Sequence, residues 1–142
     1  MQQHALAANA RHLCLHGRRA HLIELGRRLR GLFGIELRWE GPREISEVQI
    51  IFDTGFARPL TLTHSDGFNS RIVRGPQPET VRDYVVELEV GGNWVEVKRR
   101  SDNYQRRRVH HFECLTATAL RITCTATNGD AQARLFEVRA YS

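Results

Sequence analysis

The stretch YVVELEVGGNWVEVK, Tyr84 to Lys98, holds two alternating apolar and polar runs around a pair of glycines. Successive side chains of a β-strand point to opposite faces, so alternation with period two indicates a strand with one buried face. Glycine readily adopts the positive φ angles that a tight hairpin turn needs. We therefore predict that Tyr84–Val90 pairs antiparallel with Trp94–Lys98 through a turn at Gly91-Gly92.

The same period of two recurs on both sides of this hairpin. Alternating runs occupy Val48–Phe52, His110–Cys114 and Leu120–Cys124. Turn signals separate the runs and no helical pattern lies between them, which is typical of a sandwich or a barrel. We predict an all-β fold, an antiparallel β-sandwich of the jelly-roll type, over residues 35–142. Its expected core is Trp39, Val48, Ile50, Phe52, Val86, Leu88, Phe112, Leu120, Ile122 and Leu135.

Two further turns can be placed from their residue types. Asn-Gly is a strong short signal for a hairpin, so Asn128-Gly129 is expected to join Ala119–Thr127 to Ala133–Tyr141. Pro76 and Pro78 mark a loop ahead of the central hairpin, because proline cannot donate to a sheet. These turns complete the predicted succession of short strands.

Residues 1–34 follow a different pattern and form the predicted N-terminal extension. Leucines recur there at helical spacing, which predicts a helix from about Ala20 to Phe33 that ends at Gly34. Arginines fall mostly on the remaining surface of this helix. We expect the leucines to dock on the sandwich or on a partner domain; the alternative is a basic amphipathic helix on an anionic membrane.

Length and composition fit one globular domain with a net charge of +5. No apolar run approaches the roughly 20 residues that span a bilayer, and we recognise no secretory signal. We therefore expect no transmembrane segment and leave the compartment open, with an extracytoplasmic parent as one option. Cys14, Cys114 and Cys124 form no even disulfide framework. Cys114 and Cys124 are expected as buried thiols, or as a disulfide if their strands lie side by side.

No catalytic constellation is visible, so we predict that the chain is not an enzyme by itself. Hydrolysis needs a nucleophile, a base and an orienting group in one place. His110 and His111 are neighbours on a strand and must point to opposite faces. His12 and His16 have a zinc-compatible helical spacing but lack an HExxH motif and a third ligand. No serine lies in a GxSxG motif.

The basic segment from Lys98 to Arg108 is the candidate binding surface. It links two predicted strands, and the loops of sandwiches often form binding sites. Asn103, Tyr104, Arg106 and Arg107 combine an amide, an aromatic plane and guanidinium groups, a mixture suited to sugars. The structural alternative is a capping asparagine, a core tyrosine and a solvated strand face. A second polar loop with His64 and Asn69 could join the same rim.

A polyanion is the rival ligand for the same segment. Its cations lie close together in sequence, with Trp94 and Tyr104 nearby, and could follow the phosphates of a nucleic acid or a heparin-like chain. Interspersed acids such as Glu96 and Asp102 oppose this interpretation. No known nucleic-acid-binding motif is present either. Protein–protein docking through the basic loop is a third alternative.

Several short motifs occur in a fixed order: Trp39, GGNWVEV (91–97), Asn103 with Arg106, ALRI (119–122) and ARLFEVRAY (133–141). This ordered set resembles the galactose-binding-like, or discoidin (coagulation factor 5/8 C-type), domains. The resemblance implies a jelly roll that acts as a non-catalytic binding or accessory module. Its implied partner is a glycan or a catalytic domain of the same parent chain.

Three longer segments, IFDTGF (51–56), NYQRRRVHHFE (103–113) and TATNGDAQARLFEVRAY (125–141), are similar to the C-terminal module of bacterial FAD-dependent oxidoreductases. This similarity implies that flavin chemistry belongs to another part of the parent. No GxGxxG motif follows a strand in this chain, so we expect no FAD or other cofactor here.

Many discoidin-like domains hold a structural calcium ion, and the resemblance places Glu137 at the position of one ligand. The acidic loop that supplies further ligands is missing before Trp39. Calcium takes about six or more oxygen ligands, so one carboxylate is a weak basis for a site. We prefer an ion pair of Glu137 with Arg134 or Arg139.

Overall fold

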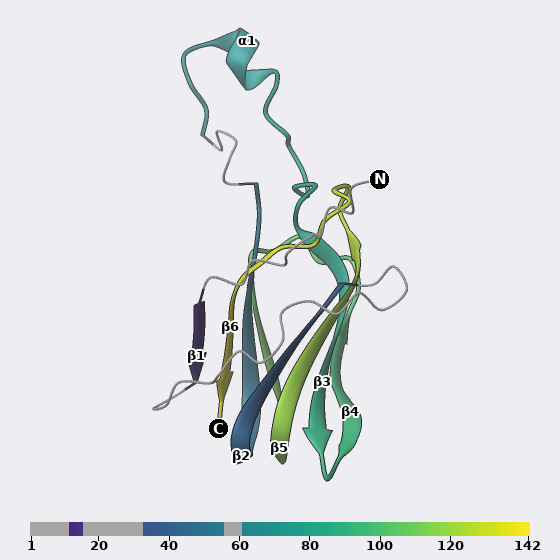
Figure 1. The fold of residues 1–142 in the computed structure, drawn as a ribbon. Helices are drawn as coiled ribbons and strands as arrows, with labels where there is room; N and C mark the ends of the chain where they lie inside the picture. The colour runs from purple at the N-terminus through teal and green to yellow at the C-terminus, as the bar shows by residue number, and fades with distance from the viewer. Residues whose placement is uncertain (1–11, 16–32, 56–60) are drawn as a thin grey trace, which may run out of the picture.

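The computed structural model describes residues 12–15, 33–55 and 61–142 of the chain. This part is almost entirely β-structure, and its short helix is far from long enough to cross a membrane (Figure 1). The elements are β1 (His12–Leu15), β2 (Phe33–Phe52), α1 (Asp66–Asn69), β3 (Val81–Val90), β4 (Asn93–Arg100), β5 (Arg107–Thr127) and β6 (Leu135–Tyr141).

The region predicted as an N-terminal extension contributes a strand to the sheet. β1 runs parallel to β6 and forms one edge. The predicted helix Ala20–Phe33 lies outside the described residues, apart from Phe33, which is the first residue of β2. Gly34 therefore continues a strand and does not end a helix as we had expected.

Two long antiparallel strands, β2 and β5, organise the whole sheet. The first half of β2 pairs with the second half of β5, and the second half of β2 pairs with the first half of β5. Register shifts interrupt this pairing between Arg38 and Arg43 and between Ile45 and Glu47. Such bulges bend and twist strands, so each long strand passes from one layer of the molecule to the other.

The remaining strands extend this bent pair on both sides. The order is β1-β6-β2-β5-β3-β4, with β6 on the second half of β2 and β3 on the second half of β5. The sheet folds over, and its two halves face each other (Figure 1). Phe52 of β2 contacts Tyr84 of β3 across the interior, with ring centroids 5.0 Å apart. The predicted antiparallel sandwich is confirmed, with β1 as a parallel addition.

The core fills the space between the two layers. Fully burying an aliphatic or aromatic side chain contributes roughly 1.5–3 kcal/mol, so these contacts dominate the stability. Of the predicted core, Trp39 and Phe112 are only partly buried against it. The other predicted residues are buried: Val48, Ile50, Phe52, Val86, Leu88, Leu120, Ile122 and Leu135.

The central hairpin forms as predicted. β3 pairs antiparallel with β4, and Val90 lies opposite Asn93. Gly91 and Gly92 have φ angles of 57° and 81°, in the region that L-residues rarely adopt. The glycine pair therefore sets both the position and the hand of this turn.

The predicted hairpin at Asn128-Gly129 is wrong. β6 pairs with β2 and β1, and its neighbour is not β5. The side-chain amide of Asn128 donates to the carbonyl oxygens of Thr80 and Asn103, at 3.0 and 2.9 Å. The turn is thus bound to neighbouring loops, and the following residues carry the chain across to the edge of β2.

The cysteines of β5 also differ from the expectation. Cys114 and Cys124 are free thiols; Cys124 is buried as predicted, but Cys114 is exposed. Burial raises the pKa of the Cys124 thiol to about 12. The register shift between Ile45 and Glu47, opposite Leu115 and His111, changes which residues of β5 face the core. The alternation that predicted a buried Cys114 stops at this bulge.

Candidate functional site

Residues 101–106, which we call the crossing loop, carry the chain from β4 to β5. Asn103 is completely buried within this loop. Its Nδ2 donates to the carbonyl oxygens of Val81 at 2.7 Å and Gln105 at 3.2 Å. Its Oδ1 accepts from the Gln105 N–H at 3.2 Å and from Arg108 Nε at 2.7 Å. A side-chain amide has two donor hydrogens and two acceptor lone pairs, so Asn103 is fully engaged within the protein.

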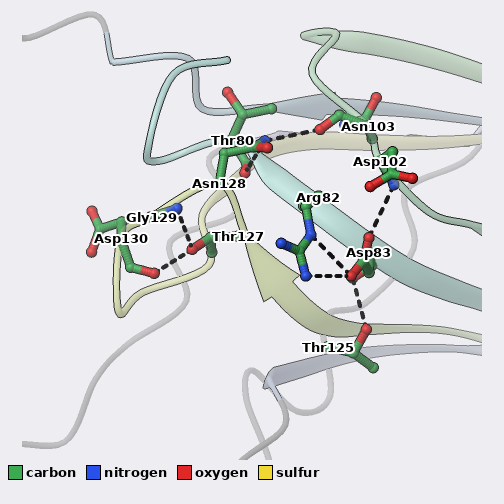
Figure 2. Close-up of polar contacts among 10 residues, drawn as sticks. All are labelled: Thr80, Arg82, Asp83, Asp102, Asn103, Thr125, Thr127, Asn128, Gly129 and Asp130. Carbon is green, nitrogen blue, oxygen red and sulfur yellow. Dashed lines mark hydrogen bonds and ion pairs between the residues drawn. The ribbon is translucent and has the colours of Figure 1, made fainter. Parts of the chain in front are cut away.

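Neighbouring connections hold the crossing loop from one side (Figure 2). Asn128 bridges the carbonyls of Asn103 and Thr80. Thr80 donates its hydroxyl to the carbonyl of Asp53 at 3.0 Å. These residues come from the connections after β2, β4 and β5, so the loops form one hydrogen-bonded unit. We call this end of the sandwich the loop end.

Asp83 of β3 holds the crossing loop from the other side (Figure 2). The backbone N–H of Asp102 donates to Asp83 Oδ1 at 3.0 Å, and Arg82 Nη2 lies 3.0 Å from Asp83 Oδ2. The hydrogen bond from Arg82 lowers the pKa of the Asp83 carboxyl group. Asp102 has a φ of 55°, a left-handed conformation that aspartate tolerates better than most residues. The crossing loop is therefore held by the Asp83 carboxylate, which is itself paired with Arg82.

The remaining predicted ligand-binding residues of the segment lie at the surface. Tyr104 is 59% exposed, which is unusual for a large aromatic side chain. Arg106 places its guanidinium 5.9 Å from the centre of the Phe136 ring. Arg107, the first residue of β5, donates from Nη2 to Gln49 Oε1 at 3.0 Å. Tyr104, Arg106 and Arg107 are thus exposed on or beside a loop that the buried Asn103 supports.

His64 and Asn69 lie on a separate excursion that carries α1. Figure 1 shows α1 projecting beyond the loop end, away from the strands. The side chain of Asn69 closes this excursion on itself, because it accepts from the Thr63 N–H at 2.9 Å and donates to the Thr63 carbonyl at 2.8 Å. His64 is exposed beside this turn. The structure gives no contact between these two residues and the crossing loop.

Trp94 is far from the crossing loop. It follows the hairpin turn, whereas the crossing loop begins at the opposite end of β4, roughly 20 Å away at about 3.3 Å per residue. Arg121 stacks on its ring at 4.1 Å, and Arg121 also pairs with Glu87 at 2.8 Å. Trp94 is therefore not part of the crossing loop, and its ring is covered on one face by Arg121.

The two adjacent histidines of β5 face opposite sides, as predicted. His110 is buried, and its Nε2 lies 2.8 Å from the Tyr84 hydroxyl. Burial, followed by the charges of nearby cations, lowers the pKa of His110 to about 4. His111 is exposed, with its Nδ1 3.2 Å from Glu47 Oε2. The hydrogen bond between Tyr84 and His110 joins the two layers. Alternation in the sequence shows which face a residue occupies, so it could not have revealed this contact.

The structure describes the surroundings of two residues that were considered as metal ligands, Glu137 and His12. Both carboxylate oxygens of Glu137 bind Arg139, at 2.8 and 3.0 Å. This ion pair is one of those we preferred to calcium. His12 belongs to a strand, so it does not have the helical geometry on which the zinc spacing depended. Within residues 12–15, 33–55 and 61–142 no cluster of three metal-ligating side chains occurs.

Comparisons with known proteins identify the fold. No family model and no curated protein matches the sequence. Among solved structures, the family 32 carbohydrate-binding module of EndoD from Streptococcus pneumoniae superposes with a TM-score of 0.56 at 16% identity. That match covers 78% of this chain and 70% of the module.

Two further structures show the same architecture. The module CpGH89CBM32-5 from Clostridium perfringens, in complex with GalNAc-β-1,3-galactose, matches with a TM-score of 0.55 at 13% identity over 78% of this chain and 66% of the module. Chitosan-binding module 1 of a chitosanase/glucanase from Paenibacillus sp. IK-5 superposes with a TM-score of 0.55 at 13% identity. That match covers 87% of this chain and 73% of the module. The chain therefore has the jelly-roll fold of these modules, at identities that show the fold alone.

Proposed function

We propose that this chain is a carbohydrate-binding accessory module. The observation that carries the proposal is the exposed Tyr104 on a crossing loop that buried Asn103 holds in place. An aromatic plane covers the C–H face of a sugar ring, and nearby donors bind its hydroxyl groups. Arg106 and Arg107 are the donors next to Tyr104 in this chain.

The fold supports the same proposal. The structural neighbours include a module in complex with GalNAc-β-1,3-galactose and a chitosan-binding module. A loop that is held by hydrogen bonds before its ligand arrives loses little conformational entropy on binding. In this proposal the chain holds a glycan, and another domain carries out the reaction.

That other domain is the second half of the proposal. The segments 51–56, 103–113 and 125–141 resemble the C-terminal module of FAD-dependent oxidoreductases, so we propose a flavin-dependent catalytic domain of the parent chain as the partner. In the described part of this chain no glycine-rich strand–turn–helix unit is present to hold a dinucleotide. Purified chain is expected to be colourless, and stoichiometric flavin in it would contradict this assignment.

Titration with glycans tests the binding role. A panel of neutral, amino and acidic oligosaccharides is titrated into the chain by calorimetry. Tyr104→Ala removes the stacking plane and is expected to weaken binding about tenfold, or about 1.4 kcal/mol. Tyr104→Phe keeps the plane and should retain most of the affinity.

Val95→Ala is the matched control, because Val95 is also an exposed apolar side chain, 40% accessible, but lies opposite Leu88 at the hairpin end of β4. That position is roughly 20 Å from the crossing loop at about 3.3 Å per residue. This substitution should leave glycan affinity unchanged. Absence of binding to every member of the panel would overturn the proposal. So would equal effects of Tyr104→Ala and Val95→Ala.

A further inference from the structure

Two cations lie on the inner face of the edge strand β4. Lys98 is opposite Val86 and Arg100 is opposite Tyr84 in the antiparallel register. Directly opposed residues point to the same face, and both Val86 and Tyr84 are buried in the core. Lys98 and Arg100 thus extend from core-facing positions, and both are exposed because β4 has no further strand beyond it.

The first half of β5 presents a third cation from the other layer. Arg108 is opposite Ile50 and His110 is opposite Val48, and both partners on β2 are fully buried. Arg108 and His110 therefore also occupy core-facing positions. The hydrogen bond of His110 to Tyr84, at 2.8 Å, brings the two layers together at this point. We call Lys98, Arg100 and Arg108 the inner basic edge.

The inner basic edge adjoins the crossing loop. This loop starts directly after Arg100 and ends two residues before Arg108. Arg108 binds the side chain of Asn103 within the loop. The cations and the exposed Tyr104 are thus parts of one connected segment, and a single extended ligand could contact both.

The cations of the inner basic edge differ from the six arginines of the described residues that pair with carboxylates. No ion pair joins Lys98, Arg100 or Arg108 to a carboxylate of the described residues, and Arg108 binds only the neutral amide of Asn103. Paired arginines of the same part of the chain are Arg38, Arg82, Arg99, Arg121, Arg134 and Arg139.

The positive field of the inner basic edge acts on His110. Burial is the main cause of the lowered pKa of His110, and the next causes are the charges of Lys98, Arg108 and Arg100. The imidazole is therefore neutral at physiological pH, and the three cations lie near enough to influence it. Like charges gathered at the rim of a low-dielectric interior favour an anion that enters between them.

We propose that the inner basic edge binds the acidic group of an anionic carbohydrate, a carboxylate or a sulfate. This inference rests on the proposed function and names the class of its ligand. Guanidinium groups bind carboxylates and sulfates through paired, charge-assisted hydrogen bonds, and lysine adds a point charge. Tyr104 would contact the sugar ring while the edge contacts its charge.

The test compares ligands that differ only in charge. An oligomer of galacturonic acid, its methyl ester and a sulfated galactan oligomer are titrated into the chain, with a single-stranded oligonucleotide of equal charge as a fourth ligand. We expect at least one acidic sugar to bind about tenfold more tightly than the methyl ester. Comparing the affinities for the galacturonic acid oligomer and the sulfated galactan oligomer then shows whether a carboxylate or a sulfate is preferred.

Neighbouring arginines on β4 give a matched pair of variants. Arg100→Ala and Arg99→Ala remove the same charge from adjacent residues, but Arg99 points to the outer face and pairs with Glu96. Arg100→Ala and Lys98→Ala are expected to weaken binding of the acidic sugar about five- to tenfold and to reduce its salt dependence. Arg99→Ala should change affinity less than twofold.

The outcomes separate this inference from the proposed function. Equal binding of the uronate and its methyl ester, with loss in Tyr104→Ala, would overturn the inference and leave the glycan role standing. If no carbohydrate binds, both the inference and the proposed function are overturned. Stronger binding of the oligonucleotide than of both acidic sugars would overturn the inference in favour of a nucleic-acid partner. Inward-pointing charges also protect sheet edges from association; self-association of Arg100→Ala with unchanged sugar affinity would show that protective role instead.

Discussion

Asn103 and Tyr104 are adjacent in sequence but have opposite roles in the structure. Asn103 is buried and binds other groups of the protein, whereas Tyr104 is 59% exposed on the crossing loop that the sequence had singled out. The sequence could locate the segment because amides, aromatics and guanidiniums gather there. The sequence could not show that Asn103 supports the loop while Tyr104 forms its surface. The burial of Asn103 depends on Val81 and Asn128, which are more than 20 residues away in sequence.

His110 gives a residue-scale prediction about acid stability. Its pKa is about 4 in the folded chain against 6.5 for the free side chain, so the unfolded state takes up the proton first as the pH falls. The contribution of neutral His110 to the free energy of unfolding is complete above pH 6.5 and is lost between pH 6.5 and about 4. A tenfold change in proton affinity corresponds to about 1.4 kcal/mol, so we expect a loss of roughly 2–3 kcal/mol over this window.

His110→Gln is the variant that checks this prediction. Glutamine can still bond to the Tyr84 hydroxyl but does not titrate. The free energy of unfolding, measured in urea at several pH values, should fall less steeply in this variant between pH 6.5 and 4.5. An NMR titration in which His110 protonates near pH 6.5 would contradict the argument.

At the scale of elements, local turn chemistry succeeded in one place and failed in another. Gly91-Gly92 connects strands that pair with each other, so the turn and the pairing agree. Asn128-Gly129 has an equally strong local signal, but the edge of β2 competes for β6 and Thr80 binds the turn residue. Such long-range competition is not visible in a short window of sequence.

Gly91 supplies the element-scale prediction. Its φ of 57° is unfavourable for a residue with a Cβ, so Gly91→Ala should destabilise the fold by about 1 kcal/mol. Gly41→Ala in β2 is the control, because its new Cβ would meet no atom within 4 Å. Urea unfolding should show a lower midpoint for Gly91→Ala alone. Equal midpoints for both variants would show that the turn carries no strain.

For the whole molecule, period-two alternation predicted the sandwich and most of its core. It missed the parallel strand β1, since His12–Leu15 is too short to stand out in sequence. It also split β5 into two strands, because the bulge opposite Glu47 breaks the alternation without ending the strand. Alternation reports which residues face the core and does not report where a strand crosses between layers.

The edge formed by β1 yields a prediction at this scale. Deleting residues 1–32 removes β1 and leaves β6 without its outer partner. Amide hydrogen exchange in β6 should then accelerate, while exchange in β3 and β4, on the opposite side of the sheet order, stays as in the intact chain. Unchanged protection of β6, or loss of the whole sheet, would contradict this account.

The shared strands β2 and β5 have a consequence for how the module yields to force. Each runs through both layers, so neither layer can be peeled away without drawing backbone out of the other. We therefore expect all-or-none unfolding, with no state that retains a single layer, and slow folding because the pairings are distant in sequence. In the proposed setting, tethered between a glycan and a catalytic domain, the chain is expected to stay intact under load up to one sharp rupture.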